Sequence, residues 1–421
     1  MKTDFDMHPA DLYQQFAEFG RAVARNAALH DRERSFDRAA WDMISRAGLW
    51  RIPVPLEEGG LGGSWADCAA AMEGVASTAG DLGFLITMLG HVGSLRVLLE
   101  EGTLQQKARW LPQIMEGQVG ITAMTEASGG SDLARMSVSA RDVDGRLSLC
   151  GEKVHITNAP IASSGLVAGR MPALGEKKDI TLFFLDLDAP GITIGEREDN
   201  LGIRTSPTAN LLFEETPIED DNIIGPPGDG LRILYRIIAF ERALYGIMTA
   251  GLIEDMIERT MSRVEARMAF GRPLADYQYV QGRITDMKMA AVICRTMTYA
   301  SMAKLENGAQ DMSIACSVTK FQAGEKLLEA AEHMVQLHGH LGYMNNDISR
   351  YLRDAVGMRI AGGTSDIQRI NIFNQIRARR RDLTTQEPGS AELPGDAKPA
   401  GRFSEHPAQS TEAPKPGIVY A

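Results

Sequence analysis

The sequence predicts a three-part fold, in which a helical segment, a compact β domain and a bundle of long helices follow one another along 421 residues. Three observations predict this order. Apolar residues recur at helical spacing up to about residue 118, alternate in short runs from there to about 228, and return to helical spacing up to about 382. We therefore predict an α-helical N-terminal domain at 1–118, a β-barrel-like middle domain at 119–228, a C-terminal four-helix bundle at 229–382 and a tail at 383–421.

The first segment carries helical signals on both sides of a loop. Apolar residues recur at three and four positions through Leu12–Leu29 and Asp37–Ala47, and the stretch Trp65–Leu99 is mostly apolar and small. Between them, Glu57–Gly63 is predicted to be a loop because four of its seven residues are glycine.

The middle segment changes to β patterning. Val138–Val143 and Leu147–Cys150 alternate around the turn Asp144-Gly145, which predicts a hairpin. Further short β-like runs follow at Gly165–Ala168, Ile180–Asp186, Ile192–Ile194 and Asn210–Glu215.

The last segments differ in composition. From Leu231 to about Asp382 the helical period predicts four or five long helices that form a bundle. The tail at 383–421 places prolines among Gly, Ala, Ser and Glu, so it cannot bury enough apolar surface to offset its ordering entropy. We expect this tail to be disordered.

The net charge and the cysteine spacing argue against several classes of binding site and cross-link. A net charge of -11 argues against binding to nucleic acid or an anionic membrane, since both require a basic face. The four cysteines form no C-x-x-C pair, so neither a disulfide framework nor a metal site is expected. Residues 1–15 lack the apolar core of a signal peptide and no run of eighteen apolar residues exists, so we expect a cytoplasmic protein without a membrane span.

Two segments carry candidate chemistry, and neither is a nucleotide motif of the P-loop or G-x-G-x-x-G kind. In Met124–Asp132 a strand runs into a Ser/Gly loop, whose free N–H groups and hydroxyls suit a pyrophosphate. In Ala361–Arg369 a glycine break precedes a helix start, with Ser365 and Gln368 in capping-box form and Thr364 as an alternative cap.

These two segments resemble the two signatures of acyl-CoA dehydrogenases, and the similarity covers about residues 9–382. Supporting matches in the same order are His155–Asn158, Arg267–Gly271, Gln336–Gly339 and Arg353–Ala355. The resemblance implies the acyl-CoA dehydrogenase-like fold, FAD as the cofactor, and a homodimer or homotetramer that builds each FAD site across a subunit interface.

The resemblance also implies the FAD contacts. Met124 and Thr125 would bind the flavin ring, Ser131 the pyrophosphate, and Thr157 the ring near its reactive nitrogen, with His155 where the family usually has an aromatic residue. The contacts expected from the neighbouring subunit are Arg267, Phe270, Gln278, Gln336 and Gly339. Thr364 and the residue at Asp366, usually a longer side chain, would touch the nucleotide.

The base that removes the α-proton shows a departure from the commonest family pattern. Many members place it just before the Gly-Thr of the second signature, where this chain has Gly362. Members that resemble the isovaleryl- and long-chain enzymes instead supply a glutamate from a bundle helix, just before an arginine, as in Glu241-Arg242. Glu241 also lies in an apolar helical stripe, where desolvation raises the pKa of a carboxyl group toward that of a useful base. A structural glutamate held by an arginine is the alternative.

The sequence thus predicts FAD-dependent dehydrogenation of an acyl thioester, with Glu241 as base and the Gly362 N–H as a donor to the thioester oxygen. The acyl carrier is CoA or a carrier protein, and an electron-transfer flavoprotein or another acceptor would take the electrons. Two alternatives on the same fold stay open, which are a flavin monooxygenase or N-hydroxylase and a non-enzymatic DNA-binding flavoprotein.

Overall fold

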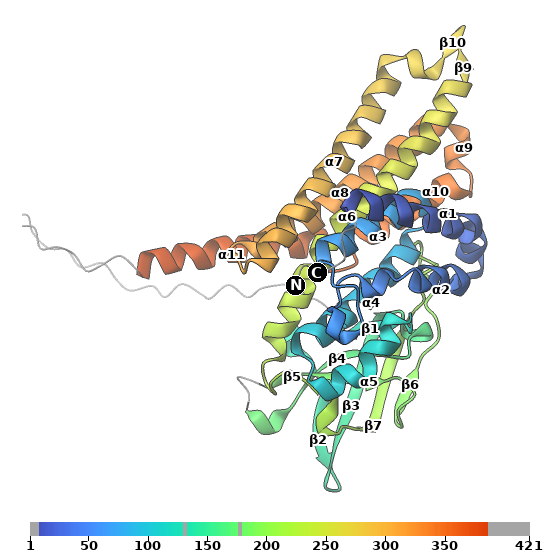
Figure 1. The fold of residues 1–421 in the computed structure, drawn as a ribbon. Coiled ribbons are helices and arrows are strands. Elements are labelled where there is room, and N and C mark those ends of the chain that lie inside the picture. The colour runs from blue at the N-terminus through green and yellow to red at the C-terminus, as the bar shows by residue number, and fades with distance from the viewer. Residues whose placement is uncertain (1–7, 129–132, 176–178, 386–421) are drawn as a thin grey trace, which may run out of the picture. The chain divides into compact units, whose positions relative to one another are not determined.

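The computed structural model describes residues 8–128, 133–175 and 179–385. The chain divides into a large unit, 1–377, and a short unit, 378–421, of which 378–385 are helical. Within the large unit, a group of helices is followed by a sheet and then by long helices (Figure 1). Of the tail that the sequence predicts to be disordered, only 383–385 are among the described residues.

The N-terminal helices begin where the sequence supplies caps. Their bounds are α1 Pro9–Glu33, α2 Arg38–Arg46, α3 Trp65–Ala79, α4 Leu82–Glu101 and α5 Leu104–Met115. Asp37 caps α2 by accepting a hydrogen bond from the Ala40 N–H at 2.9 Å. Ser64 and Asp67 form a reciprocal capping box that starts α3. The helices predicted over 12–29 and 37–47 are therefore confirmed.

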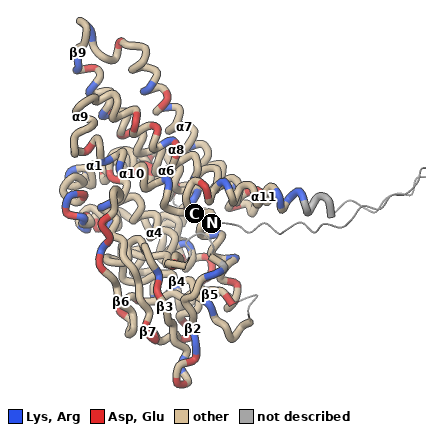
Figure 2. Tube along the Cα trace, turned by 180° about the vertical axis from the view of Figure 1, so that it is seen from behind, with Lys and Arg blue, Asp and Glu red and all other residues tan. Residues whose placement is uncertain are grey.

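The apolar stretch Trp65–Leu99 forms two helices, α3 and most of α4. Gly80 ends α3 in the left-handed conformation, at φ +58°, and Asp81 then caps α4 by accepting from the Phe84 N–H. The window of highest hydropathy in α4 would be long and apolar enough to cross a membrane, but 89% of it is buried within the protein. Figure 2 shows α4 in tan over most of its length, as expected of a helix in the centre of a core.

The middle part is a curved sheet with its own apolar core. Its strands are β1 Gly120–Ala123, β2 Ser139–Val143, β3 Arg146–Thr157, β4 Ser164–Arg170, β5 Ile180–Asp186, β6 Ile192–Ile194, β7 Thr208–Pro217 and β8 Ile223–Ile224. They pair in the order β6-β7-β3-β2-β4-β5-β8, and β1 pairs with β4 in parallel. Apolar side chains from β1, β3, β5 and β7 share one buried cluster, so the sheet wraps around it.

The predicted hairpin is present as β2 and β3, but β3 continues past Cys150 to Thr157. The alternation in the sequence is lost there because the pairing of β3 with β7 shifts register twice, after Leu149 and after Lys153. Gly151 and His155 take positive φ angles within these irregular stretches, +127° and +56°. The His155 side chain, on one of these irregular stretches, is 68% exposed.

Long helices form the C-terminal part. Their bounds are α6 Gly230–Ala266, α7 Gln278–Glu306, α8 Met312–His338, α9 His340–Tyr343, α10 Asp347–Met358 and α11 Ser365–Thr385. The short hairpin of β9 (Met268–Ala269) and β10 (Arg272–Pro273) joins α6 to α7. Short 3-10 helices occur along the chain at Leu49–Arg51, Leu56–Glu58, Leu133–Arg135, Ala159–Ile161, Pro172–Leu174, Asp220–Asn222 and Leu274–Asp276. In the bundle, α6, α7 and α8 pack on one another and α10 packs on α8.

A buried ion pair ties the end of β1 to β3. The Lys153 ammonium, fully buried, lies 2.7 Å from the Glu126 carboxylate and also donates to the Met124 carbonyl. Glu126 accepts further hydrogen bonds from the N–H groups of Ser137 and Val138. Because both charges are paired and hydrogen-bonded, the pair holds the strand end at Met124 without a buried uncompensated charge.

We expect Glu126→Gln to lower the free energy of unfolding by about 3–5 kcal/mol, because the change leaves Lys153 charged and buried without a counter-charge. The double variant Glu126→Gln/Lys153→Met should recover part of this loss. Chemical denaturation measures both values. As a control, Asp42→Asn breaks the exposed Arg38–Asp42 pair and should cost less than about 1 kcal/mol. Equal losses from the buried and exposed pairs would contradict this account.

Candidate active site

Glu241 lies on α6 with its carboxyl group directed at α4. A Cβ atom added to Gly93 would lie 2.3 Å from Glu241 Oε1 and 3.2 Å from the Thr122 hydroxyl, so both oxygens border the same small space. Only glycine at position 93 leaves room for the carboxyl group there. The Thr122 hydroxyl is buried and has no hydrogen-bond partner among the described residues.

The stripe predicted around Glu241 is buried as expected. Leu234, Ile238, Tyr245, Met248 and Leu252 are each at most 8% exposed. Burial raises the pKa of the Glu241 carboxyl to about 8, and the nearby Arg242 guanidinium offsets only part of that rise. A carboxyl group with this pKa can accept a proton near neutral pH, as a general base must.

The loop between α10 and α11 brings Gly362 to the same helix. Gly362 and Gly363 take left-handed φ angles of +68° and +92°. The Gln368 side chain donates to both glycine carbonyls, at 3.2 and 2.9 Å, and so fixes the loop. The Arg242 guanidinium also approaches the Gly362 carbonyl, at 3.5 Å.

The start of α11 uses Thr364 as its cap. The Thr364 hydroxyl accepts from the Ile367 N–H at 3.2 Å, whereas the Ser365 hydroxyl donates to Glu325 and Gln368 holds the glycine loop. Of the two capping patterns open from the sequence, Thr364 is the one adopted. Asp366 pairs with Arg369 at 2.7 Å and its side chain is 83% exposed.

The two segments that carry the candidate flavin-ring residues lie side by side. The Val154 N–H donates to the Thr125 carbonyl at 2.9 Å, which places the segment after β1 beside the end of β3. Thr125 and Thr157 are half-buried, and neither hydroxyl has a partner among the described residues. His155 is engaged at 2.7 Å with Glu198. Ser131 lies outside the described residues.

The residues expected from a neighbouring subunit lie elsewhere in the fold. Arg267, Phe270 and Gln278 are exposed around the β9–β10 hairpin, and Gln336 and Gly339 are exposed at the end of α8. Since α6 is continuous from Gly230 to Ala266, the 26 residues from Glu241 to Arg267 span about 39 Å. One chain therefore does not bring these residues to Glu241.

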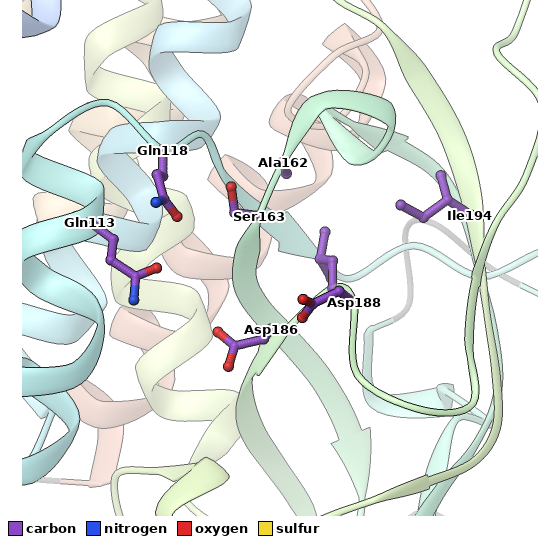
Figure 3. A pocket seen from close by; sticks show the side chains of 8 residues that line it. Gln113, Gln118, Ala162, Ser163, Asp186, Asp188 and Ile194 are labelled. Carbon is purple, nitrogen blue, oxygen red and sulfur yellow. The ribbon is translucent and has the colours of Figure 1, made fainter.

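Two surface hollows lie away from these residues. One of about 520 Å³ lies between α5 and the end of β5, where Gln113, Gln118, Ser163, Asp186 and Asp188 contribute polar groups (Figure 3). Another, of about 370 Å³, is lined by residues including Trp65, Tyr299 and Met302. Neither is lined by Glu241 or by a residue expected to bind FAD, so the site is defined by side-chain geometry rather than by a hollow.

Sequence reasoning missed several residues around Glu241. Gly93 and Thr122 carry no pattern that separates them from other glycines and threonines of α4 and β1. The sequence places Tyr245 in the apolar stripe around Glu241, but it does not predict that the Tyr245 ring packs against Gly362. Lys320 of α8 was also missed, although a lysine on the inner face of a bundle helix is a recognisable signal.

Comparisons with known proteins match most of the length of the chain. Three family models match in order along the chain: acyl-CoA dehydrogenase N-terminal domain over residues 10–118, middle domain over 122–216 and C-terminal domain over 228–376.

Individual relatives are similar over most of their length. The mitochondrial 2-methylacyl-CoA dehydrogenase of Solanum tuberosum is 31% identical over 375 residues, which are 87% of this chain and 90% of that protein. The solved structure of the prolyl acyl carrier protein oxidase AnaB is 26% identical, with a TM-score of 0.83 over 88% of this chain and 99% of that one. The FAD complex of PigA is 25% identical, with a TM-score of 0.82 over 89% and 100%.

The fold and these similarities define a flavin-dependent oxidoreductase whose cofactor is FAD. The hydroxyls of Thr125 and Thr157, which have no partner among the described residues, suit the polar rim of a flavin ring. The chain belongs to the acyl-CoA dehydrogenase family, as its sequence motifs predict.

Proposed function

We propose that this protein dehydrogenates an acyl thioester between its α- and β-carbons, with Glu241 as the base. The observation that carries the proposal is the Glu241 carboxyl group, which is half-buried on α6, extends toward Gly93 of α4 and has a raised pKa. Position 362, where many family members have the base, carries no side chain. The similarity to a 2-methylacyl-CoA dehydrogenase and to a prolyl acyl carrier protein oxidase supports a thioester substrate on either kind of carrier.

The chemistry divides between the chain and its cofactor. FAD, when bound, supplies the acceptor for the hydride that leaves the β-carbon. Glu241 takes the α-proton, and the electron pair of that C–H bond becomes part of the new double bond. Negative charge develops on the thioester oxygen during this transfer, so a nearby N–H donor such as that of Gly362 lowers the barrier.

Residues around the site keep Glu241 effective. The apolar stripe of α6 leaves the Glu241 carboxyl group half-buried and limits its contact with water, which raises its pKa. Gly93 of α4 leaves the space into which the carboxyl group extends, and the Gln368 side chain holds the Gly362–Gly363 loop opposite α6. Orientation of this kind contributes to the rate because the proton and its acceptor meet in one geometry.

We also propose that the FAD site is completed by a second copy of the chain. Arg267 and Phe270 are too far along α6 from Glu241 to serve the same site within one chain, and Phe270 is 98% exposed. Tyr279, at the start of α7, is 93% exposed. Exposed aromatic residues beside an arginine favour a contact that covers them, and an arginine pairs well with a diphosphate.

Glu241→Gln should lower the rate of anaerobic flavin reduction by an acyl thioester by about 10²–10⁴-fold, because glutamine cannot accept the α-proton. FAD content should not change. Stopped-flow absorbance at the oxidised-flavin band measures the rate. Glu258→Gln makes the same change on the solvent side of α6 and should leave the rate unaltered. Turnover retained by Glu241→Gln would remove Glu241 from the mechanism, and a wild-type flavin that no acyl thioester bleaches would reject the proposed reaction.

The reduction rate should rise with pH. Glu241 acts only when it is ionised, and with a pKa of about 8 it is mostly protonated at pH 7. Below pH 8 each unit of pH should therefore change the rate about tenfold, and the rate should level off above pH 8. Single-turnover reduction at saturating substrate between pH 6 and 9.5 gives the profile. A rate that is independent of pH over this range would contradict the raised pKa.

Arg267→Ala should raise the dissociation constant for FAD by about 10- to 100-fold, as expected for the loss of a charge-assisted hydrogen bond. Fluorescence titration of the flavin-free protein with FAD measures it. Arg146→Ala, at the β2–β3 turn, is the matched control and should leave FAD affinity unchanged. Unaltered affinity in Arg267→Ala, or a wild-type holoenzyme that sediments as a monomer, would overturn the shared site.

A further inference from the structure

The space that Gly362 leaves open is filled by Tyr245. A Cβ atom at position 362 would lie 2.6 Å from Tyr245 Cε2 and 2.9 Å from the Tyr245 hydroxyl oxygen. The Glu241 carboxyl group does not occupy this space, since it extends toward Gly93 instead. The phenol of Tyr245 therefore stands where a side chain at position 362 would begin.

Tyr245 and Glu241 share one face of α6. They are four residues apart, so their α-carbons are separated by about 6 Å along the helix axis. In a thioester, the carbonyl oxygen is two bonds from the α-carbon. A substrate whose α-proton faces Glu241 can thus place its oxygen one helical turn away, toward Tyr245 and Gly362.

The Tyr245 side chain is buried, and its hydroxyl has no hydrogen-bond partner among the described residues. The side chain is 4% exposed. The hydroxyl is not one of the fully buried unpaired atoms of the described residues, so it keeps access to the space around it. A hydroxyl that is unpaired and accessible can donate to a ligand that enters the site.

The charged groups around Tyr245 suit a hydrogen-bond donor. Lys320 Nζ lies 5.7 Å from the centre of the ring and donates to the Met358 carbonyl, while Arg242 approaches the Gly362 carbonyl. These cations favour negative charge at this end of the site. Burial, with a smaller effect from Glu241, raises the pKa of Tyr245, so the phenol keeps its proton.

We propose that Tyr245 is a further catalytic residue, which donates a hydrogen bond from its hydroxyl to the carbonyl oxygen of the acyl thioester. The proposal rests on the proposed function. As Glu241 removes the α-proton, the electron pair of the C–H bond moves toward the carbonyl group and charge grows on its oxygen. Tyr245 stabilises that charge without transferring its proton, beside the Gly362 N–H. Residue 245 then supplies a donor from the same helix as the base.

The test separates proton removal from hydride transfer. 3-Thiabutanoyl-CoA has an acidic α-proton but a sulfur atom at the β-position, so it can ionise in the site without reducing FAD. The pH titration of its long-wavelength absorbance with the holoenzyme gives the pKa of the bound analogue. Tyr245→Phe should raise that pKa by about two units, which is about a 10²-fold loss of stabilisation, and slow flavin reduction to a similar extent.

Control variants show whether Tyr245 donates a hydrogen bond to the substrate or only packs against its neighbours. Tyr351 is a buried phenol that hydrogen-bonds to Asp255, so Tyr351→Phe should lower thermal stability without changing the pKa of the bound analogue. An unchanged pKa in Tyr245→Phe, with either normal or weakened binding of the analogue, overturns the proposal and leaves Tyr245 as packing. If no acyl thioester reduces the wild-type holoenzyme, the proposed function fails instead, so the two failures are distinguishable.

Discussion

The close approach of α4 and α6 at Gly93 determines where the carboxyl group of Glu241 can lie. With any side chain at position 93, the two helices would have to separate or the carboxyl group would have to turn away. The contact is part of the partial burial that raises the pKa of the carboxyl group to about 8. Packing between α4 and α6 therefore determines the position of the carboxyl group and contributes to its proton affinity.

Much of the fold follows from local signals in the sequence. The helical stripe on α6 predicts that Glu241 points into the protein, and the hairpin, the later strands and the family motifs occur where the pattern places them. The break between α3 and α4 was less visible, because a single Gly-Asp step interrupts a continuous apolar stretch. The continuation of β3 was missed because two register shifts destroy its alternation.

The surroundings of Glu241 could not be read from the sequence, because they depend on contacts between distant segments. Along the sequence, the whole eight-stranded sheet lies between Gly93 and Glu241, and more than a hundred residues lie between Tyr245 and Gly362. Periodicity in the sequence predicts the side of a helix on which a residue lies. It does not predict which atoms of other segments that residue contacts. The resemblance in the motifs indicated that position 362 has no side chain and that a glutamate lies on α6. Only the structure showed that the Tyr245 ring packs against Gly362.

The left-handed Gly362 has an evolutionary consequence. A glutamate at position 362 would have to adopt a backbone conformation that is unfavourable for residues with a side chain. It would also have to occupy the space that the Tyr245 ring fills. A lineage that moved its base from α6 to this loop would first have to exchange the tyrosine for a smaller residue. The order of the mutational steps is therefore constrained, and the two positions are expected to vary together among descendants of this chain.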